Sequence, residues 1–138
     1  TGYTNKYYEK FILNKFINCK KIFLLQCVSA YPAPEIETNI SVIKHYSSLS
    51  KKNNKIIPGY SSHDIGSLCS QLAIASGAKM IEKHVKFGDV AWAHFDDVAI
   101  DLADDSFINF VKDIRRAERI LGSESKKIQP SENHKYWI

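Results

Sequence analysis

One short apolar run, Ile22-Phe23-Leu24-Leu25, gives the first strong indication of the fold. Four successive apolar residues without alternation are typical of a strand that is covered on both faces, as the strands of a parallel sheet are. Pro32 and Pro34 end this segment. Pro34 can also begin the next helix, because a residue in the first helical turn needs no N–H. The run therefore predicts a strand, a turn and a helix in that order.

The same order of strand and helix is repeated along the chain. Helices are expected where apolar residues recur every three or four positions, and strands where short apolar runs lie between polar turns. The expected elements are a helix over residues 3–18, a strand over 22–25, a helix over 34–46, a strand over 55–61, a helix over 64–76, a strand over 79–85 and a helix over 104–122, with 86–103 irregular. Alternating strands and helices predict an α/β fold with a parallel sheet.

The number of strands limits what this chain can form by itself. A closed (β/α)8 TIM barrel needs about 250 residues, and 138 residues with three expected strands are too few. A three-stranded parallel sheet would also have two open edges and bury little, although parallel strands are normally covered. We therefore expect residues 1–122 to be part of a TIM barrel and residues 123–138 to be a polar tail or linker.

Composition and charge are those of an ordinary soluble globular protein. Apolar residues make up 44% and charged residues 25% of the chain. The net charge of +4 comes without a dense block of Lys or Arg, which disfavours a nucleic-acid partner. Three cysteines lack Cys-x-x-Cys spacing, so neither a disulfide framework nor a zinc site is expected. With no signal peptide and no apolar run of about 20 residues, we expect a cytoplasmic protein without a membrane partner.

Strand alternation indicates which polar side chains could carry chemistry. Because alternate residues of a strand face the same side, each expected strand has an apolar beginning and a polar end on one face. A TIM barrel requires this pattern, with packing inside and reactive groups at the carboxyl ends of its strands. The polar residues expected to converge on one cavity are Ser29, Tyr31, Ser61, His63, Glu82 and His84.

Two of these residues, His63 and His84, lie at equivalent ends of successive strands. With Glu82 they could bind a divalent metal, because imidazole suits Mn, Fe or Zn and a site with few protein ligands leaves positions open for substrate. A single histidine is more often structural. Glu82 could instead form a buried salt bridge, and Tyr31 could simply pack beside Pro32. The remaining histidines have no such context and are expected on the surface or in loops: His45, His94 and His134.

Several segments, taken together, resemble the motifs of the sialic acid synthase family. Residues 24–34 read Leu-Leu-Gln-Cys-Val-Ser-Ala-Tyr-Pro-Ala-Pro and resemble L-L-x-C-x-S-x-Y-P-x-P. Residues 59–64 read Gly-Tyr-Ser-Ser-His-Asp and are similar to G-Y-S-D-H-T. Residues 77–84 read Gly-Ala-Lys-Met-Ile-Glu-Lys-His and resemble G-A-x-x-I-E-K-H. Pro130-Ser131-Glu132 resembles the P-S-E after the barrel, and Thr1-Gly2 resembles the end of S-T-G-M.

The family has a (β/α)8 barrel, so the resemblance implies that this chain supplies the last three strands with their helices. It also implies a transferase that condenses phosphoenolpyruvate with N-acetylmannosamine or a related N-acetylated sugar. The products would be phosphate and a nine-carbon keto acid. A divalent metal, usually Mn, is the implied cofactor, with His63 and His84 as its ligands. The metal would act as a Lewis acid on the sugar aldehyde.

The resemblance implies roles for five further positions. Ser61 would hydrogen-bond phosphoenolpyruvate, whereas Ser29 and Tyr31 would line the sugar pocket. Glu82 would lie beside the metal and the sugar, which makes Glu82 and Tyr31 the expected catalytic residues. Asp96 would contact sugar hydroxyls from the loop after the last strand.

The chain departs from the family's motifs near these positions. Ser62 stands where the family has Asp, and Asp64 stands where it has Thr. Residues 94–97, His-Phe-Asp-Asp, replace G-P-D-H. These departures leave the metal pair intact and bear on the choice of sugar. The lysines that hold phosphoenolpyruvate in the family would lie on strands that precede Thr1.

Two other hypotheses are open. The chain could be a non-catalytic truncated remnant, or a module that completes a barrel by binding a chain that supplies the other strands. It could also belong to another metal-dependent barrel enzyme, such as an aldolase or a hydrolase. Because family members are commonly dimers, a second copy of the chain is a further expected partner.

Overall fold

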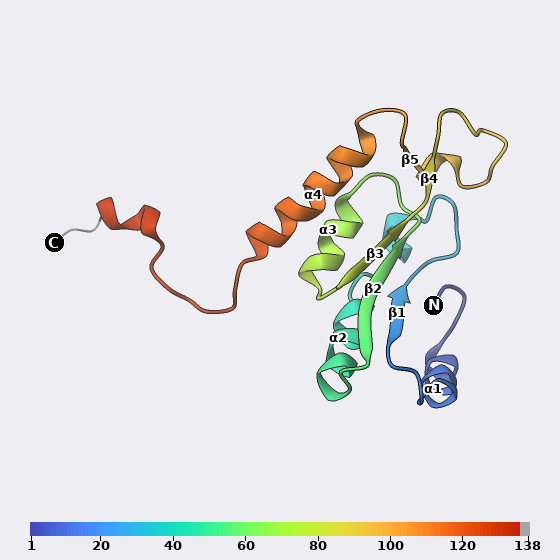
Figure 1. The fold of residues 1–138 in the computed structure, drawn as a ribbon, viewed down its shortest axis with the longest axis horizontal. Helices are drawn as coiled ribbons and strands as arrows, with labels where there is room; N and C mark the ends of the chain where they lie inside the picture. The colour runs from blue at the N-terminus through green and yellow to red at the C-terminus, as the bar shows by residue number, and fades with distance from the viewer. Residues whose placement is uncertain (136–138) are drawn as a thin grey trace.

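A three-stranded parallel sheet forms the centre of the computed structural model, which describes residues 1–135 and the side chains of residues 1–132 (Figure 1). Its strands are β1 (Ile22–Gln26), β2 (Ile56–Ser62) and β3 (Met80–Lys83). β2 is the middle strand and is buried along almost its whole length. Both neighbours of β2 run parallel to it, so the predicted α/β fold with a parallel sheet is confirmed.

Four α-helices of the described chain accompany this sheet. They are α1 (Lys6–Lys15), α2 (Val42–Lys52), α3 (Leu68–Ala75) and α4 (Ser106–Leu121), with short 3-10 turns η1 (Glu35–Glu37), η2 (Asp96–Val98) and η3 (Pro130–Lys135). α2 and α3 pack on one face of the sheet, and α4 packs against α3. α1 begins where the side chain of Asn5 accepts hydrogen bonds from the N–H groups of Tyr7 and Tyr8.

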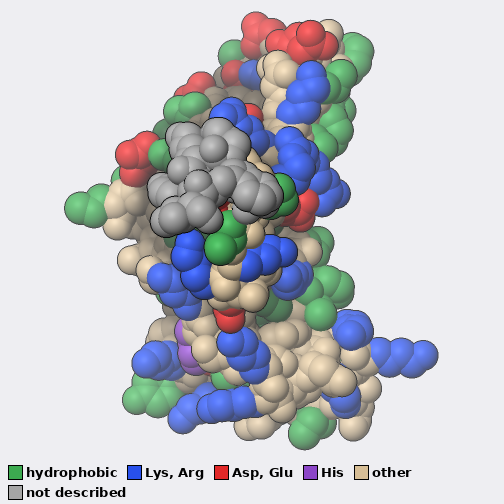
Figure 2. Space-filling model, turned by 90° about the vertical axis from the view of Figure 1, so that its left-hand side faces the viewer, with side chains coloured by type: hydrophobic (Ala, Val, Ile, Leu, Met, Phe, Trp, Pro, Cys, Tyr) green, Lys and Arg blue, Asp and Glu red, His purple; other side chains and the backbone are tan. Residues whose placement is uncertain are grey.

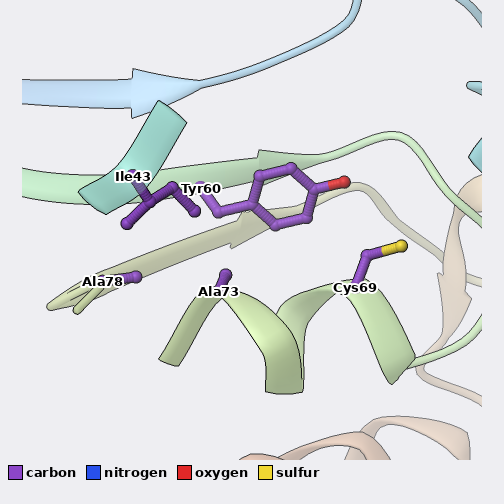
Figure 3. Close-up of a cluster of buried hydrophobic side chains, with 5 residues drawn as sticks. All are labelled: Ile43, Tyr60, Cys69, Ala73 and Ala78. Carbon is purple, nitrogen blue, oxygen red and sulfur yellow. The ribbon is translucent and has the colours of Figure 1, made fainter. Parts of the chain in front are cut away.

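The hydrophobic core lies between β2 and the helices that cover it. Ile43 of α2 and Ala73 of α3 are fully buried beside Tyr60 of β2 (Figure 3). A second buried cluster joins Leu24 of β1 to Tyr46 of α2. Burial of a large apolar side chain stabilises a fold by about 1.5–3 kcal/mol. This packing holds β2 in place. The polar residues at the carboxyl ends of the strands directly follow these packed segments.

The first helix, α1, covers Lys6–Lys15 and is shorter than the expected helix over residues 3–18. Two further helices differ from their expected bounds because the backbone turns into the left-handed region. The expected helix over residues 34–46 is broken at Asn39, which has a φ of 45°, so that η1 and α2 are separate. The expected helix over residues 64–76 begins only at Leu68, after Gly66 at a φ of 79°. A residue with positive φ cannot continue a right-handed helix. Both expected bounds were therefore wrong at their beginnings.

The expectation of an irregular segment over residues 86–103 is wrong at its two ends. β4 (Val85–Lys86) and β5 (Ile100–Asp101) pair in parallel, and β5 is followed by α4. Strands of two residues are too short to give a periodic pattern. The sequence pattern therefore predicts α4 but does not reveal the short strand β5 that directly precedes it.

The chain after α4 leaves the sheet. Residues 123–129 lead from α4 to η3, at a distance from the rest of the chain (Figure 1). Residues 136–138 of the predicted tail lie outside the described residues. Lys and Arg side chains occur over most of the face in Figure 2, separated by polar, acidic and apolar ones. Among the helices that the structure describes, none has the length and apolar character needed to cross a membrane.

Candidate functional site

A hollow of about 480 Å³ lies at the carboxyl ends of the three central strands. Its lining consists of Thr1, Phe23, Leu25, Cys27, Tyr31, Ser61, His63, Glu82 and His84. Five of the seven residues predicted to form the site are among them. Parallel strands bring their carboxyl ends to one edge, which explains why residues far apart in the sequence meet here.

The two predicted metal ligands lie next to each other. The rings of His63 and His84 have centroids 5.2 Å apart. Nδ1 of His63 lies 2.7 Å from the carbonyl oxygen of Val28. A carbonyl can only accept, so Nδ1 carries the proton in this contact and Nε2 of the neutral ring carries the lone pair. Metal-binding histidines are typically held by such a contact.

The charge state of His84 also suits a ligand. Burial lowers its pKa below the ordinary value of 6.5, and the neighbouring His63 lowers this pKa further. The neutral ring, which is the form that binds a metal, is therefore favoured. Within the part of the chain that the structure describes, no group of three or more His, Cys, Asp or Glu side chains is arranged to hold a metal. The two histidines are thus a partial donor set, and metal binding stays a prediction.

Tyr31 lies at the centre of an aromatic cluster. Its ring centroid is 4.2 Å from that of His63, and its ring packs edge-on against His84 at 5.5 Å. Burial is the main cause that raises the pKa of the Tyr31 hydroxyl, which keeps this hydroxyl protonated as a hydrogen-bond donor. Tyr31 therefore has contacts well beyond Pro32, the neighbour it was expected to pack against if it had no role in the site.

Ser61 and Glu82 form a polar pair on the wall of the hollow. The two residues are opposite each other in the parallel ladder between β2 and β3. The Ser61 hydroxyl donates a hydrogen bond of 2.6 Å to Oε1 of Glu82. Glu82 is exposed in this chain, and the alternative of a buried salt bridge with a barrel lysine stays open. The pair offers a carboxylate and a hydroxyl to a polar ligand.

The structure does not bring Ser29 and Asp96 to the lining of the hollow. Ser29 is exposed and lies against Gly2, where an added Cβ would come 2.1 Å from its hydroxyl oxygen. Oδ1 of Asp96 accepts a hydrogen bond of 2.6 Å from Lys86 and one of 3.3 Å from the N–H of Val90. Contact of Ser29 or Asp96 with a sugar stays a prediction.

Two residues of the site were missed in the sequence. The ring of Phe95 stacks on His84, with centroids 4.9 Å apart and planes 12° apart. His94 packs edge-on against Tyr31 at 4.8 Å, although it is exposed in a loop as expected. No periodicity marks a loop residue, and the only signal was the altered segment over residues 94–97. Of the other histidines, His45 is exposed as expected, and the side chain of His134 lies outside the described residues.

The departures at Ser62 and Asp64 lie behind the hollow and are absent from its lining. Both side chains are buried, and the Ser62 hydroxyl donates to Oδ1 of Asp64 at 2.6 Å. Tyr60 donates to the same oxygen at 2.8 Å. Burial is the main cause that raises the pKa of the Tyr60 hydroxyl, with the hydrogen bond to Asp64 second. These departures therefore change the support of the site and not its wall.

With the geometry in view, comparison with known proteins identifies the family. Residues 4–126 match the model of the NeuB family. The chain belongs to the NeuB family. The human and mouse N-acetylneuraminate-9-phosphate synthases are each 38% identical to it over 109 residues, which are 78% of this chain and 29% of each relative. The pseudaminic acid synthase of Helicobacter pylori is 36% identical over 115 residues, or 83% of this chain and 32% of that protein. The NeuB-family chain thus spans about a third of the length of these curated relatives.

Solved structures agree with this relationship. The N-acetylneuraminic acid (sialic acid) synthetase of Leptospira borgpetersenii superposes with a TM-score of 0.78 at 30% identity, covering 96% of the NeuB-family chain and 45% of that chain. A putative spore coat polysaccharide biosynthesis protein E from Chromobacterium violaceum has a TM-score of 0.76 at 21% identity, which shows the fold alone. The resemblance to sialic acid synthases that the motifs indicated is confirmed.

Proposed function

We propose that the complete natural protein that contains residues 1–138 condenses phosphoenolpyruvate with an N-acetylated sugar. The products would be a nine-carbon keto acid and phosphate. One observation carries the proposal: Tyr31, Ser61, His63, Glu82 and His84 line a single hollow. The names of the relatives support it, because they are synthases of N-acetylneuraminate 9-phosphate and of pseudaminic acid.

In this proposal the chain is the C-terminal half of a (β/α)8 barrel. The parallel order of β1, β2 and β3 and the parallel pair of β4 and β5 support it. So does the alternation of strands with helices, which is the connectivity of such a barrel. β1 and β3 are edge strands of their sheet, so strands from the rest of the protein could pair with them.

The polar pair on the wall of the hollow is assigned to the substrates. Ser61 would hydrogen-bond phosphoenolpyruvate by turning its hydroxyl proton to the substrate from Glu82, to which it donates at 2.6 Å in this structure. Glu82 lines the hollow and is exposed, so its carboxylate can accept a hydrogen bond from a sugar hydroxyl. Tyr31 would form the apolar wall of the sugar pocket and offer its protonated hydroxyl as a donor.

His63 and His84 are assigned to a divalent metal, with Mn expected. The contact between Nδ1 of His63 and the carbonyl of Val28 supports this assignment, because it leaves Nε2 as the coordinating atom. The lowered pKa of His84 supports it as well. When bound, the metal would supply Lewis-acid polarisation of the sugar aldehyde. Two protein ligands leave coordination positions for the substrate.

Phosphate release tests this proposal directly. The complete protein is incubated with phosphoenolpyruvate, N-acetylmannosamine and Mn²⁺, and each component is omitted in turn. Phosphate should appear only when all three are present, and His63→Asn should remove most of the activity. His45→Asn is the matched control, because His45 is exposed, pairs with Glu9 and does not line the hollow. Phosphate release that needs neither sugar nor metal would contradict the proposal.

A second candidate function is a barrel-completing module that binds another chain. The apolar side chains that the fold leaves exposed favour it, with Tyr7 83% exposed on α1 and Phe23 55% exposed on β1. Another chain that carries the preceding strands should then co-purify with this one in a one-to-one complex. A reading frame that continues upstream of Thr1 through those strands would contradict the module.

A further inference from the structure

A buried polar network lies behind the hollow, on the helix-covered face of β2. Ser62 is fully buried and Asp64 is 2% exposed. Oδ1 of Asp64 accepts hydrogen bonds from the hydroxyls of Tyr60 and Ser62. Its other oxygen, Oδ2, is buried and has no hydrogen-bond partner among the described residues. A carboxylate in such surroundings needs a compensating positive charge.

Lys83 of β3 supplies that charge. Its Nζ donates a hydrogen bond of 2.9 Å to the hydroxyl oxygen of Ser62, and it also donates to the backbone carbonyl of Asp64. The Ser62 hydroxyl accepts from Lys83 while it donates to Asp64, so it links the ammonium to the carboxylate. Charge-assisted hydrogen bonds of this kind are stronger than neutral ones. The network therefore ties β2 to β3 through side chains.

The network and the hollow alternate along the same two strands. Ser61 is opposite Glu82 in the ladder, and Ser62 is opposite Lys83. The first pair lines the hollow and the second belongs to the buried network. The ladder ends at this second pair, just before the two histidines. Beyond the ladder, the carbonyls of His63 and His84 accept backbone hydrogen bonds from Ala33 and Ile100. These bonds hold the backbone of each histidine and leave the orientation of its ring to side-chain contacts.

We propose that Asp64 and Lys83 are positioning residues that hold His63 and His84 in place from behind the sheet. Asp64 directly follows His63, and Lys83 directly precedes His84, so the network restrains the backbone beside each ring. The identity of the ligand that the two imidazole rings bind rests on the proposed function. The positions of the rings do not rest on it, because the network consists only of contacts within this chain.

The imidazole proton of His63 gives a readout of its position. Nδ1 of His63 lies 2.7 Å from the carbonyl oxygen of Val28, so this proton is protected from exchange with water. NMR of the metal-free complete protein, with 15N-labelled histidine, measures the exchange rate. Asp64→Asn and Lys83→Met should each speed this exchange about tenfold or more, because local opening becomes easier.

Two references separate a local effect from a global one. Glu118→Gln is the control variant, because Glu118 is an exposed carboxylate that pairs with Arg115 on α4. It should leave the exchange of the His63 proton unchanged. The backbone amide of Leu24 reports global opening, because Leu24 lies in a different buried cluster. Its exchange should change much less than that of the His63 proton.

Two double variants test the network even if a single variant folds poorly. Asp64→Asn with Lys83→Met removes both charges, so it should regain part of the protection that each single change removes. Ser62→Asp with Asp64→Ser moves the carboxylate to a position already in contact with Lys83. This exchange of residues should keep protection within about threefold of that in the unmodified protein.

Two results would overturn the inference. One is a His63 proton that exchanges equally fast in Asp64→Asn and in Glu118→Gln. The other is a loss of protection in Asp64→Asn with Lys83→Met that equals the summed losses of these two singles, together with an exchange of Ser62 and Asp64 that protects no better than Asp64→Asn. Binding of Mn²⁺ to the unmodified protein is measured separately by electron paramagnetic resonance. Its absence would count against the proposed function, while the exchange data would still decide the role of Asp64 and Lys83.

Discussion

The two faces of the central sheet differ, although the same strands build both. On the hollow side, Ser61 and Glu82 form a polar pair that can meet a ligand. On the helix side, one residue along, Tyr60 and Ser62 are buried under α2 and α3. Strand alternation thus places packing and chemistry on neighbouring residues. The comparison teaches that changes on the helix side should affect stability first, and changes on the hollow side should affect binding first.

The largest expected effect is on the helix side. Ile43→Ala should lower the free energy of unfolding by about 2–5 kcal/mol, because Ile43 is fully buried in the core. Phe23→Ala on the hollow side should cost less than about 1 kcal/mol, because Phe23 is more than half exposed. Urea denaturation of the two variants measures both values. Equal losses would break the distinction between the faces.

The next effect concerns the affinity for Mn²⁺. His63→Asn and His84→Asn should each weaken binding of Mn²⁺ about tenfold or more while leaving the unfolding midpoint nearly unchanged. Isothermal titration of the complete protein measures the affinity. His45→Asn serves as the control, since His45 is exposed and does not line the hollow. Unchanged affinity in both site variants would place any metal elsewhere.

A smaller effect separates two serines of the predicted site. Ser61→Ala should raise the KM for phosphoenolpyruvate about tenfold, because the hydroxyl that would bind it is lost. Ser29→Ala should change it by less than about twofold, because Ser29 does not line the hollow. Steady-state kinetics with varied phosphoenolpyruvate measure both. An effect at Ser29 as large as that at Ser61 would contradict this separation.

The smallest effect concerns the pKa of the His84 imidazole. Burial, and next the neighbouring His63, lower its pKa, so folding favours the neutral ring. The contribution of His84 to stability is therefore present above pH 6.5 and is lost as the pH falls through the lowered pKa. NMR titration of the metal-free protein should find a midpoint below 6.5, and His63→Asn should raise it partway back. A midpoint at or above 6.5 in the unmodified protein would contradict this environment.

Much of the site could be predicted because the period of a strand is regular. Alternation from an apolar beginning places Ser61 and His63 on one side of β2, and Glu82 and His84 on the matching side of β3. The parallel order of the strands then brings these residues together. The same alternation, continued beyond the end of β1, also indicated Tyr31, and the family motifs then assigned Tyr31 to the sugar pocket.

The features that the sequence did not predict depend on backbone turns and on the course of loops. The late start of α3 depends on the left-handed conformation of Gly66, which no periodicity records. Phe95 reaches His84 only because the loop between β4 and β5 returns to the strand ends. The buried contacts of Asp64 involve a residue type that is normally exposed, so its burial was not expected from the sequence.

Anomalous diffraction at the manganese absorption edge tests the central claim most directly. Crystals of the complete protein grown with Mn²⁺ should show one strong peak in the hollow, within coordination distance of Nε2 of both His63 and His84. Tyr31, Ser61 and Glu82 should surround the same hollow, with no second peak of equal height elsewhere on the chain. A peak bound by other residues, or two histidines that do not share a metal, would contradict the account.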